Sequence, residues 1–352
     1  MTIDVREAEL PAEREILLDT LVRNRDHGDM ALRRQRFQWS HSTNPYGTPR
    51  AWLAVDRASG RVIGATTAFP RQVLVHGRAT LGWNGGDTSI DREFRTLGPA
   101  VKLRRAVKQC VDRGEMAFLY SFPVDRMRAV LEQIGHVVIG ELARHGIVVR
   151  IDRFLGRATG RPKLARCLAG MTNPFLSMWP GNWRRGGEFE VVVENRRRFD
   201  RQYDDLFERV AARHPVITVR DARFLNWRFA DNPLHAGALT FSLNGGGRLC
   251  GYAIVDVNED RARVIDFLVD GSAETQYALW SRVTGWLRRR GVCTLTMHAT
   301  EREPAMRILR SFGPAFRDGT NASITVHTRG EGPCGALLDE QNWFMTQADR
   351  DV

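Results

Sequence analysis

The fold of this 352-residue chain is decided by the stretch Asp87-Thr88-Ser89-Ile90-Asp91-Arg92-Glu93-Phe94-Arg95-Thr96-Leu97-Gly98-Pro99-Ala100. It reads as a strand, a turn and the start of a helix. Backbone N–H groups that converge just before a helix N-terminus create a site for a pyrophosphate. Gly98 and Ala100 are small enough for close approach, and Pro99 removes only a donor that the first helical turn leaves unpaired. The stretch therefore predicts a phosphate-binding turn.

An internal duplication surrounds this stretch, because matching segments occur in the same order in both halves of the chain. Trp39 precedes Asn44-Pro45 with the same spacing with which Trp227 precedes Asn232-Pro233. The offset is 188 residues there and 178 at the last match, and such length changes belong in loops. The two tryptophans are expected to pack at the corner between helix and strand. The other matches are 61–64 with 248–251, 87–91 with 266–270, 113–114 with 290–291, and Gly135 with Gly313.

Each copy reads as an α/β unit, with helix, strand, turn, further strands, a long helix, a strand and a helix. We expect an N-terminal domain at 1–150 with the phosphate-binding turn, and a degenerate second copy at 188–330. A basic connector at 151–187 and a tail at 331–352 complete the chain. The glycines of the connector predict loops around one short helix near 163–169. A length of 352 residues is consistent with two domains.

The turn resembles the acyl-CoA-binding signature of the Gcn5-related N-acetyltransferase (GNAT) superfamily: Arg or Gln, two residues, Gly, one residue, then Gly or Ala. Arg95, Gly98 and Ala100 match it. That family often has an acidic residue eight positions before the Arg and an aliphatic one five before it, where Asp87 and Ile90 stand. The resemblance spans most of residues 30–145. It implies an α/β chain of two tandem GNAT folds, each with a mixed, mostly antiparallel central sheet flanked by helices.

The same resemblance implies acyl-CoA as co-substrate, with acetyl-CoA as the default donor. The second copy has no Arg-x-x-Gly-x-Ala after Val269 and is expected to bind no CoA. The closing segment 342–349 resembles the C-terminus of tandem members from polysaccharide- and exosortase-linked gene neighbourhoods. The family pattern further implies that the thioester carbonyl lies against the strand and the pantetheine arm passes between this strand and 117–121, which should splay. The implied cofactor-binding residues are Thr88, Ser89, Ile90, Arg95, Thr96, Leu97, Gly98, Pro99 and Ala100.

Acyl transfer to an amine needs a path for the amine proton and a proton for the departing thiolate. Asp87 is the nearest carboxylate by sequence and is a candidate base. Its counterpart Asp266 occurs in the copy without the turn, so a structural role is the alternative. The family commonly has a Tyr that acts as general acid at the position of Leu131. Tyr120, at the end of the neighbouring strand, is the candidate acid, with a place in the core as the alternative.

Several function classes are excluded by composition. Five dispersed cysteines predict reduced thiols, and the histidines have no ligand spacing, so no metal is expected. The first residues resemble no signal peptide, and no apolar run suffices for a transmembrane helix, which predicts a cytoplasmic protein. A net charge of +11 favours anionic partners, but no aromatic-interleaved basic block indicates nucleic-acid binding.

The excess of positive charge is concentrated in the connector. One interpretation is a solvent-exposed face. The other is a contact with an anionic substrate or with the inner face of the membrane. The bases, beside which Asp152 is the one acid, are Arg150, Arg153, Arg157, Arg161, Lys163 and Arg166, with Arg184, Arg185 and 196–198 further on.

These observations predict an acyl-CoA-dependent N-acyltransferase that moves an acyl group directly to a primary amine of a small molecule, an amino sugar or a peptide. One alternative is the FemAB-like aminoacyl transfer of other tandem members, whose donor is aminoacyl-tRNA. Arg95, Gly98 and Ala100 argue against it. Another is a non-catalytic acyl-CoA-binding or scaffold protein, which the Leu131 substitution favours.

Overall fold

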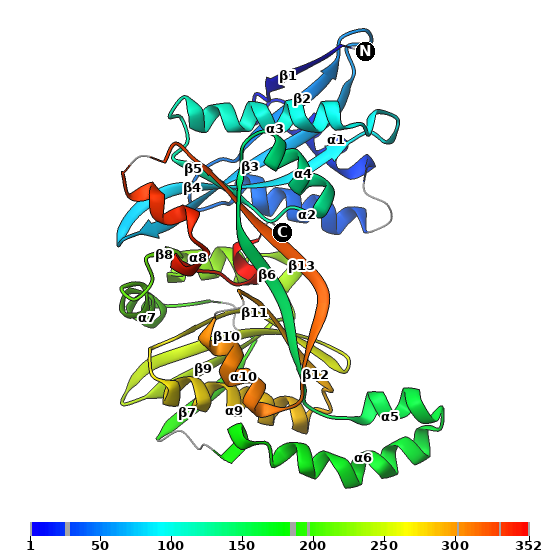
Figure 1. Ribbon diagram of the computed structural model, residues 1–352, viewed down its shortest axis with the longest axis vertical. Helices are drawn as coiled ribbons and strands as arrows, with labels where there is room; N and C mark the ends of the chain where they lie inside the picture. Colours follow the sequence, from blue (N-terminus) through cyan, green and yellow to red (C-terminus); the bar gives the residue numbers. More distant parts are fainter. Residues whose placement is uncertain are drawn as a thin grey trace.

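Two α/β halves, one above the other in Figure 1, make up the chain, shown as a computed structural model. The structure describes residues 2–24, 29–183, 188–195, 198–300, 303–330 and 332–350. The first half contains β1 (Ile3–Glu7), α1 (Arg14–Arg23), α2 (Met30–Ser42), β2 (Arg50–Asp56), β3 (Val62–Val75), β4 (Arg78–Ile90), α3 (Leu97–Asp112), β5 (Phe118–Ser121), α4 (Asp125–Gln133) and β6 (Val137–Val148).

The second half follows a helical hairpin and repeats this order of elements with one addition, the short strand β8 between its first two helices. The hairpin is α5 (Asp152–Thr159) and α6 (Pro162–Ser177). The repeat contains β7 (Phe189–Glu194), α7 (Arg201–Ala211), β8 (Val216–Thr218), α8 (Ala222–Leu225), β9 (Leu239–Gly245), β10 (Arg248–Asn258), β11 (Arg261–Val269), α9 (Ala273–Arg289), β12 (Thr294–Ala299), α10 (Pro304–Leu309) and β13 (Ala315–Thr328), followed by β14 (Trp343–Phe344).

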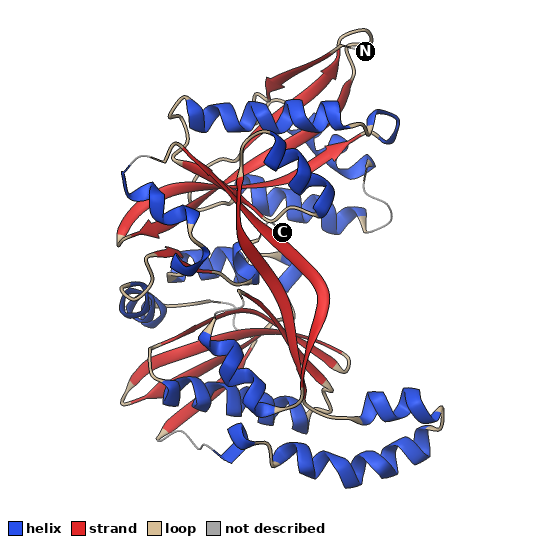
Figure 2. Ribbon diagram, viewed as in Figure 1, coloured by secondary structure: helices blue, strands red, loops and turns tan. Residues whose placement is uncertain are grey.

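One sheet of 14 strands joins the halves. Twelve of them follow the order β1-β2-β3-β4-β5-β13-β6-β12-β11-β10-β9-β7, and β8 and β14 branch off at β3. The last strand of each half crosses into the other: β13 pairs with β5 (Thr325 opposite Ser121), and β6 pairs with β12 (Val148 opposite Thr294). These two strands also pair with each other and form the long twisted ribbon between the halves in Figure 2. Each half is therefore completed by a strand of the other. The expected α/β fold with a mixed, mostly antiparallel sheet flanked by helices is confirmed.

Trp39 and Trp227, the matched tryptophans of the duplication, pack directly against each other between the halves. Their rings stack 4.6 Å apart at 17°, and Trp39 Nε1 donates to the carbonyl oxygen of Trp227 at 2.6 Å. Both side chains are buried. The expected packing role is confirmed, and the contact joins the two copies.

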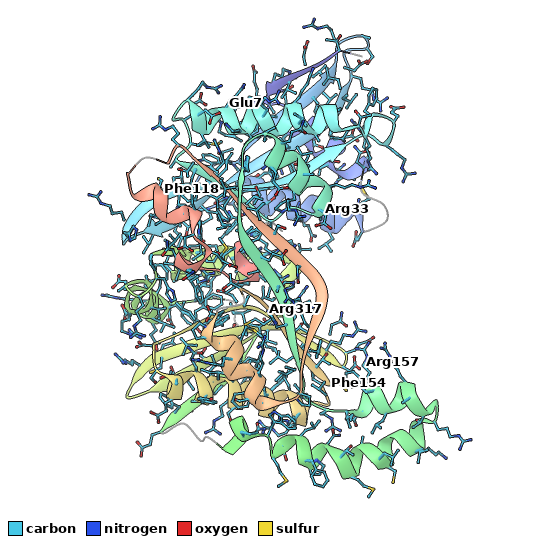
Figure 3. All side chains as sticks on the ribbon, in the orientation of Figure 1. Glu7, Arg33, Phe118, Phe154, Arg157 and Arg317 are labelled. Carbon is cyan, nitrogen blue, oxygen red and sulfur yellow. The ribbon has the colours of Figure 1, made fainter. Side chains whose placement is uncertain are left out.

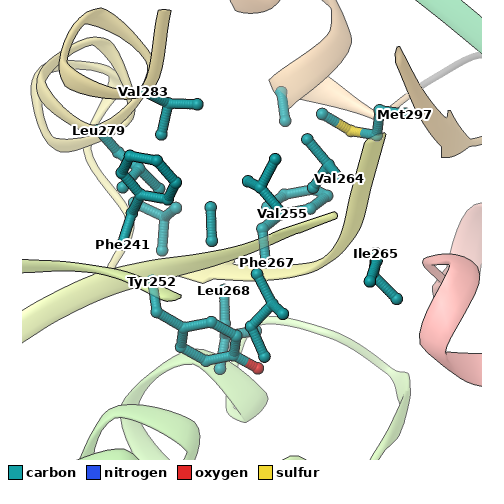
Figure 4. Packing of buried hydrophobic residues seen from close by; sticks show 14 of the residues in the cluster. Phe241, Tyr252, Val255, Val264, Ile265, Phe267, Leu268, Leu279, Val283 and Met297 are labelled. Atoms are coloured by element: carbon teal, nitrogen blue, oxygen red, sulfur yellow. The ribbon is translucent and has the colours of Figure 1, made fainter. Parts of the chain in front are cut away.

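The largest core cluster lies in the second half, where α9 covers the sheet (Figure 4). Leu279, Val283 and Leu287 recur every four residues along α9, so they share one face of the helix, and all three are fully buried. Phe241 of β9 and Phe267 of β11 pack into the same cluster. The second copy therefore has a complete helix-on-sheet core, although its sequence lacks the Arg-x-x-Gly-x-Ala turn.

The C-terminal segment is built into the sheet. β14 pairs with β8, which pairs with β3 of the first half. Asp349 accepts a hydrogen bond from Arg220 at 2.5 Å, and its carbonyl accepts one from Asn84 of β4 at 3.2 Å. The segment 332–350 therefore contacts both halves.

The connector is more helical than the expected single short helix near 163–169. Gly156 and Gly170, which predict loops, lie inside α5 and α6, because an isolated glycine costs a helix only about 1 kcal/mol. Arg184, Arg185 and residues 196–197 lie outside the described residues. Among the helices that the structure describes, none has the length and apolar character needed to cross a lipid bilayer.

Candidate functional site

The candidate site is the cleft where β4 and β5 part. The two strands run parallel and pair only at Trp83 with Leu119 and at Asn84 with Tyr120. β4 continues to Ile90, whereas β5 ends one residue after its last pair, so the expected splay is confirmed. A cavity of about 230 Å³ opens there, and we call it the β4/β5 cleft. Its lining residues are Gly85, Gly86, Asp87, Thr88, Arg104, Ser121, Phe122, Pro123, Val124, Met127 and Leu131.

A β-bulge in β4 shapes one wall of the cleft. Opposite β3, the register shifts between Ala65, which faces Ser89, and Thr67, which faces Gly86. Asp87 takes up the extra residue with a φ of +47°, a left-handed conformation that Asp tolerates better than most residues. Such bulges locally disrupt the ladder and redirect side chains. The bulge thereby places Asp87 and Thr88 at the cleft.

Asp87 is held by Arg36 of α2. Its two carboxylate oxygens accept hydrogen bonds from the two terminal nitrogens of Arg36, each at 3.0 Å, and both residues are buried. The second half has a similar arrangement, because Asp266 accepts from Arg220 at 3.1 Å and from Tyr252 at 2.7 Å. A carboxylate at this place in both copies contributes to the fold. The catalytic role of Asp87 stays a prediction.

Tyr120 is fully buried and does not line the cleft. Neighbouring strand residues point to opposite faces, so Ser121 reaches the cleft and Tyr120 packs against the rings of Phe122 and Trp343, at 6.0 and 5.8 Å. Burial raises the pKa of Tyr120 well above its ordinary value, which makes the phenol a weaker proton donor than an exposed tyrosine. Its role in catalysis also stays a prediction. Leu131 does line the cleft, where the family's Tyr would stand.

Arg104 of α3 is a cleft residue that the sequence reasoning missed. It is buried, and its terminal nitrogens donate to Thr66 Oγ1 at 3.2 Å and to Ser121 Oγ at 3.1 Å. A Cβ on Gly85 would lie only 2.3 Å from the guanidinium. The side chain therefore lies across the floor of the gap between β4 and β5, and only glycine fits against it. The sequence signal that could have indicated Arg104 is a basic residue beside the apolar helix positions Leu103 and Val107, which are buried in the structure.

The phosphate-binding turn, residues 95–100, forms the start of α3. Thr96 is the N-cap, Leu97 begins the helix, and the cap side chain makes no hydrogen bond to the first turn. The first N–H groups of a helix have no partner within it. A Cβ on Gly98 would meet only Thr96 Oγ1, at 3.9 Å, so the space outside this turn is open. The helix start is thus uncapped by Thr96 and open at Gly98, and its binding of a phosphate stays a prediction.

The remaining predicted residues flank this turn. Arg95 is exposed and donates to the carbonyl oxygens of Ile90 and Asn24, both at 3.0 Å, so it ties the turn to the end of β4 and to the first half's helices. Ser89 and Ile90 pair with β3, and Thr88 Oγ1 lies 2.7 Å from Thr66 Oγ1. Pro99 and Ala100 are buried in the first turn, and the side chain of Leu97 lies outside the described ones.

A wider cavity of about 490 Å³ lies beside the turn. Its walls include Arg23 and Arg61, which hold the buried Asp91 at 2.9 and 2.5 Å, and Arg92, which follows directly. Arg61 also pairs with Glu93 at 2.9 Å, so the acids of this cavity engage both Arg23 and Arg61. Within the described residues, no three His, Cys, Asp or Glu side chains gather as metal ligands.

No protein-family model and no curated protein sequence matches the chain. Solved structures do match its fold. A GCN5-related N-acetyltransferase from Anabaena variabilis superposes with a TM-score of 0.66 at 12% identity, over 96% of this chain and 74% of that one.

Two further structures match with similar coverage. A tandem GNAT protein from the clavulanic acid biosynthesis pathway gives a TM-score of 0.52 at 13% identity, over 94% of this chain and 100% of that one. An N-myristoyltransferase from Saccharomyces cerevisiae with bound myristoyl-CoA gives 0.53 at 10% identity, over 93% and 79%. The β4/β5 cleft, the turn at the start of α3 and these likenesses together show that the chain has the GNAT fold.

Proposed function

We propose that the chain is an acyl-CoA-dependent N-acyltransferase, with acetyl as the default acyl group, that acts on a primary amine. The observation that carries this proposal is the opening of β4 from β5 beside a helix start whose N–H groups are uncapped and unobstructed at Gly98. An extended thioester with an anionic head needs both features: a slot between strands for its arm and a donor cluster for its pyrophosphate.

Each part of the site has a proposed role. Residues 95–100 hold the pyrophosphate with backbone N–H groups, and Thr88, Ser89 and Ile90 of β4 hold the thioester arm. The amine attacks the thioester carbonyl, the tetrahedral intermediate collapses with cleavage of the C–S bond, and the thiolate leaves with a proton. Asp87, which lines the cleft, is the proposed acceptor of the amine proton. Tyr120 is the predicted donor to the thiolate, but its ring packs outside the cleft, so donation from it requires a bridging water.

The second half supports a single acyl-CoA site. Its helix α9 starts at the N-cap Ser272, whose side chain already accepts from the N–H of Thr275 at 3.1 Å. In the first half the corresponding cap, Thr96, leaves the helix start uncapped. The cavity between β11 and α10 is also narrower, about 160 Å³, and is walled by Phe344 of the C-terminal segment. The first copy therefore retains the features that a phosphate ligand requires.

The proposed acceptor is a primary amine of a small molecule, an amino sugar or a peptide. The excess of basic residues favours an acceptor with anionic groups. The resemblance of residues 342–349 to proteins from polysaccharide-linked gene neighbourhoods supports an amino sugar as the first acceptor to test.

A non-catalytic acyl-CoA-binding protein is the second candidate. One set of observations favours it: Leu131 lines the cleft in place of the family's Tyr, and Asp87 is already engaged by Arg36. Such a protein would bind acyl-CoA and release no free CoA in the presence of any amine.

The test is release of free CoA thiol from acetyl-CoA with a panel of amino sugars, nucleotide-linked amino sugars, amino acids and peptides. We expect release that depends on one class of amine. Gly98→Glu should abolish it, since the added carboxylate projects into the open space where the pyrophosphate binds. Gly237→Glu is the matched control, because a Cβ at Gly237 also meets nothing within 4 Å but lies in the second half. Equal release by wild type and Gly98→Glu would overturn the proposed site, and binding without release would favour the second candidate.

A further inference from the structure

The α5–α6 hairpin projects from the second half, and α6 runs along the lower margin of the molecule (Figure 1). One face of α6 anchors it to the body. Ala169 and Leu176 on that face are buried, and Asn173 Oδ1 accepts from the N–H of Ile151 at 2.9 Å. Arg288 of α9 donates to the carbonyl oxygen of Leu176 at 3.3 Å. The opposite face of α6 is therefore held facing outward.

That outward face is apolar. Leu164, Cys167, Met171, Phe175 and Met178 follow one another at spacings of three or four residues, so they form one stripe along the helix. Their exposure is high: 44% for Leu164, 67% for Met171, 69% for Phe175 and 56% for Met178. At 1.5 Å per residue the stripe is about 21 Å long. We call these five residues the α6 stripe.

The α6 stripe inverts the usual pattern of a surface helix, which turns its apolar face to the core and its polar face to water. Here Thr172 and Asn173 lie on the inner, less exposed side, and the thioether and phenyl groups face outward. A continuous exposed apolar surface marks a site of contact with another apolar phase.

The charges beside the stripe select the kind of surface. Of the six bases in residues 150–179, Arg150 and Arg153 pair with Asp152 and Asp260, at 2.8 and 3.4 Å, and Arg157 belongs to α5. Lys163 precedes Cys167 by four residues, so it flanks the stripe one turn earlier, and Arg161 lies at the start of the helix; both are exposed. Apolar side chains flanked by bases suit a membrane interface, where the apolar groups enter the acyl region and the bases meet anionic headgroups.

We propose that the α6 stripe docks on the surface of an anionic lipid bilayer, with the helix lying in the interface plane. α6 has 16 residues, enough to lie along the surface. The proposal concerns a surface in the second half and does not depend on acyl transfer in the first.

The test is flotation of the full-length protein with vesicles of phosphatidylcholine alone and of phosphatidylcholine with 30 mol % phosphatidylglycerol (about one anionic lipid in three, a composition within the range that attracts basic segments). We expect flotation with the anionic vesicles, weakening as salt rises. Met171→Ser/Phe175→Ser should lower the partition coefficient about tenfold or more, since two large exposed apolar groups are lost. Ile16→Ser is the matched control, because Ile16 is a helical residue that is 44% exposed on α1.

Substitutions of single basic residues separate the electrostatic contribution to vesicle binding from the contribution of the apolar side chains. Lys163→Ser should weaken binding to anionic vesicles several-fold and leave the sedimentation coefficient of the protein unchanged. Arg157→Ser should have no effect, because Arg157 projects from α5 on the side away from α6 (Figure 3). Cys167, the exposed one of the five cysteines, allows a polarity-sensitive fluorophore to be placed within the stripe, and its emission should shift to the blue on binding.

Three results would overturn the proposal. The first is flotation of wild type that is no greater with anionic vesicles than without vesicles. The second is flotation of Met171→Ser/Phe175→Ser that equals that of wild type. The third is a wild-type dimer, seen by sedimentation velocity, that the double variant converts to monomer without any vesicle binding by wild type. That result would make the α6 stripe an interface between two copies.

Discussion

The ion pair between Arg36 and Asp87 should be one of the strongest single determinants of the geometry of the cleft. Both oxygens of Asp87 are engaged at 3.0 Å, and the two residues are 8% and 5% exposed. Two unit charges about 4 Å apart attract by about 4 kcal/mol at an effective dielectric constant of about 20. Removal of one partner leaves a buried charge uncompensated, which costs about 3–5 kcal/mol. We therefore expect Arg36→Met and Asp87→Asn each to lower the free energy of unfolding by about 3–5 kcal/mol.

A double-mutant cycle measures the interaction directly. In urea unfolding, Arg36→Met/Asp87→Asn should cost less than the sum of the single variants by about 2 kcal/mol or more, because the double variant buries no lone charge. The exposed bidentate pair of Arg57 with Asp4 is the matched control, since its partners are 66% and 54% exposed and solvent screens them. If the effects of Arg36→Met and Asp87→Asn on the free energy of unfolding are additive, the ion pair does not support the bulge and the reasoning is refuted.

Three other predictions follow from the same structure. Burial lowers the pKa of His41 to about 4, so the unfolded chain binds its proton more readily, and this contribution to stability should be lost as pH drops from about 6.5 towards 4. Other buried histidines with lowered pKa values add to the total loss, so the measured quantity is the difference between variants: between pH 7.5 and 5, the free energy of unfolding from urea titrations should fall by about 2 kcal/mol less in His41→Gln than in wild type, and equal losses would contradict the prediction. In a fragment of residues 1–150, β5 and β6 lack their partner β13, so their backbone edges are exposed. The fragment should aggregate alone and form a stable complex when it is co-expressed with residues 151–352. A monomeric, folded fragment on gel filtration would show that the strand exchange is dispensable. Tyr120→Phe should lower kcat about 100-fold at unchanged KM if the phenol protonates the thiolate, and unchanged kcat would leave Tyr120 a packing residue only.

The parts of the fold that were predictable rest on local sequence patterns. The strand, turn and helix around Gly98 follow from small residues, a helix-compatible Pro99 and apolar periodicity, whereas α3 begins at Leu97, inside the predicted turn. The duplication predicted the recurrence of elements and the packing of Trp39 and Trp227. Such signals act over a few residues or repeat at a fixed distance, so a single sequence contains them.

The parts that were missed depend on contacts between distant residues. The exchange of β6 and β13 between the halves pairs residues that lie far apart in the sequence, 146 positions for Val148 with Thr294 and 204 for Ser121 with Thr325. The sequence of neither strand indicates its partner. Arg104 reaches the cleft from α3, and Arg36 reaches Asp87 from α2, because the sheet brings these helices to its faces. The glycines of α5 and α6 predicted loops, but packing of the hairpin onto α9 outweighs their low helix propensity.

The central claim is that the turn at Gly98 binds the pyrophosphate of acyl-CoA, and isothermal titration tests it most directly. Acetyl-CoA and free CoA would be titrated into wild type, Gly98→Glu and Gly237→Glu, with circular dichroism to show that all three are folded. The structure predicts that wild type and Gly237→Glu bind both ligands with similar affinity and that Gly98→Glu binds neither. Absence of binding to wild type, or undiminished binding to Gly98→Glu, would contradict the claim.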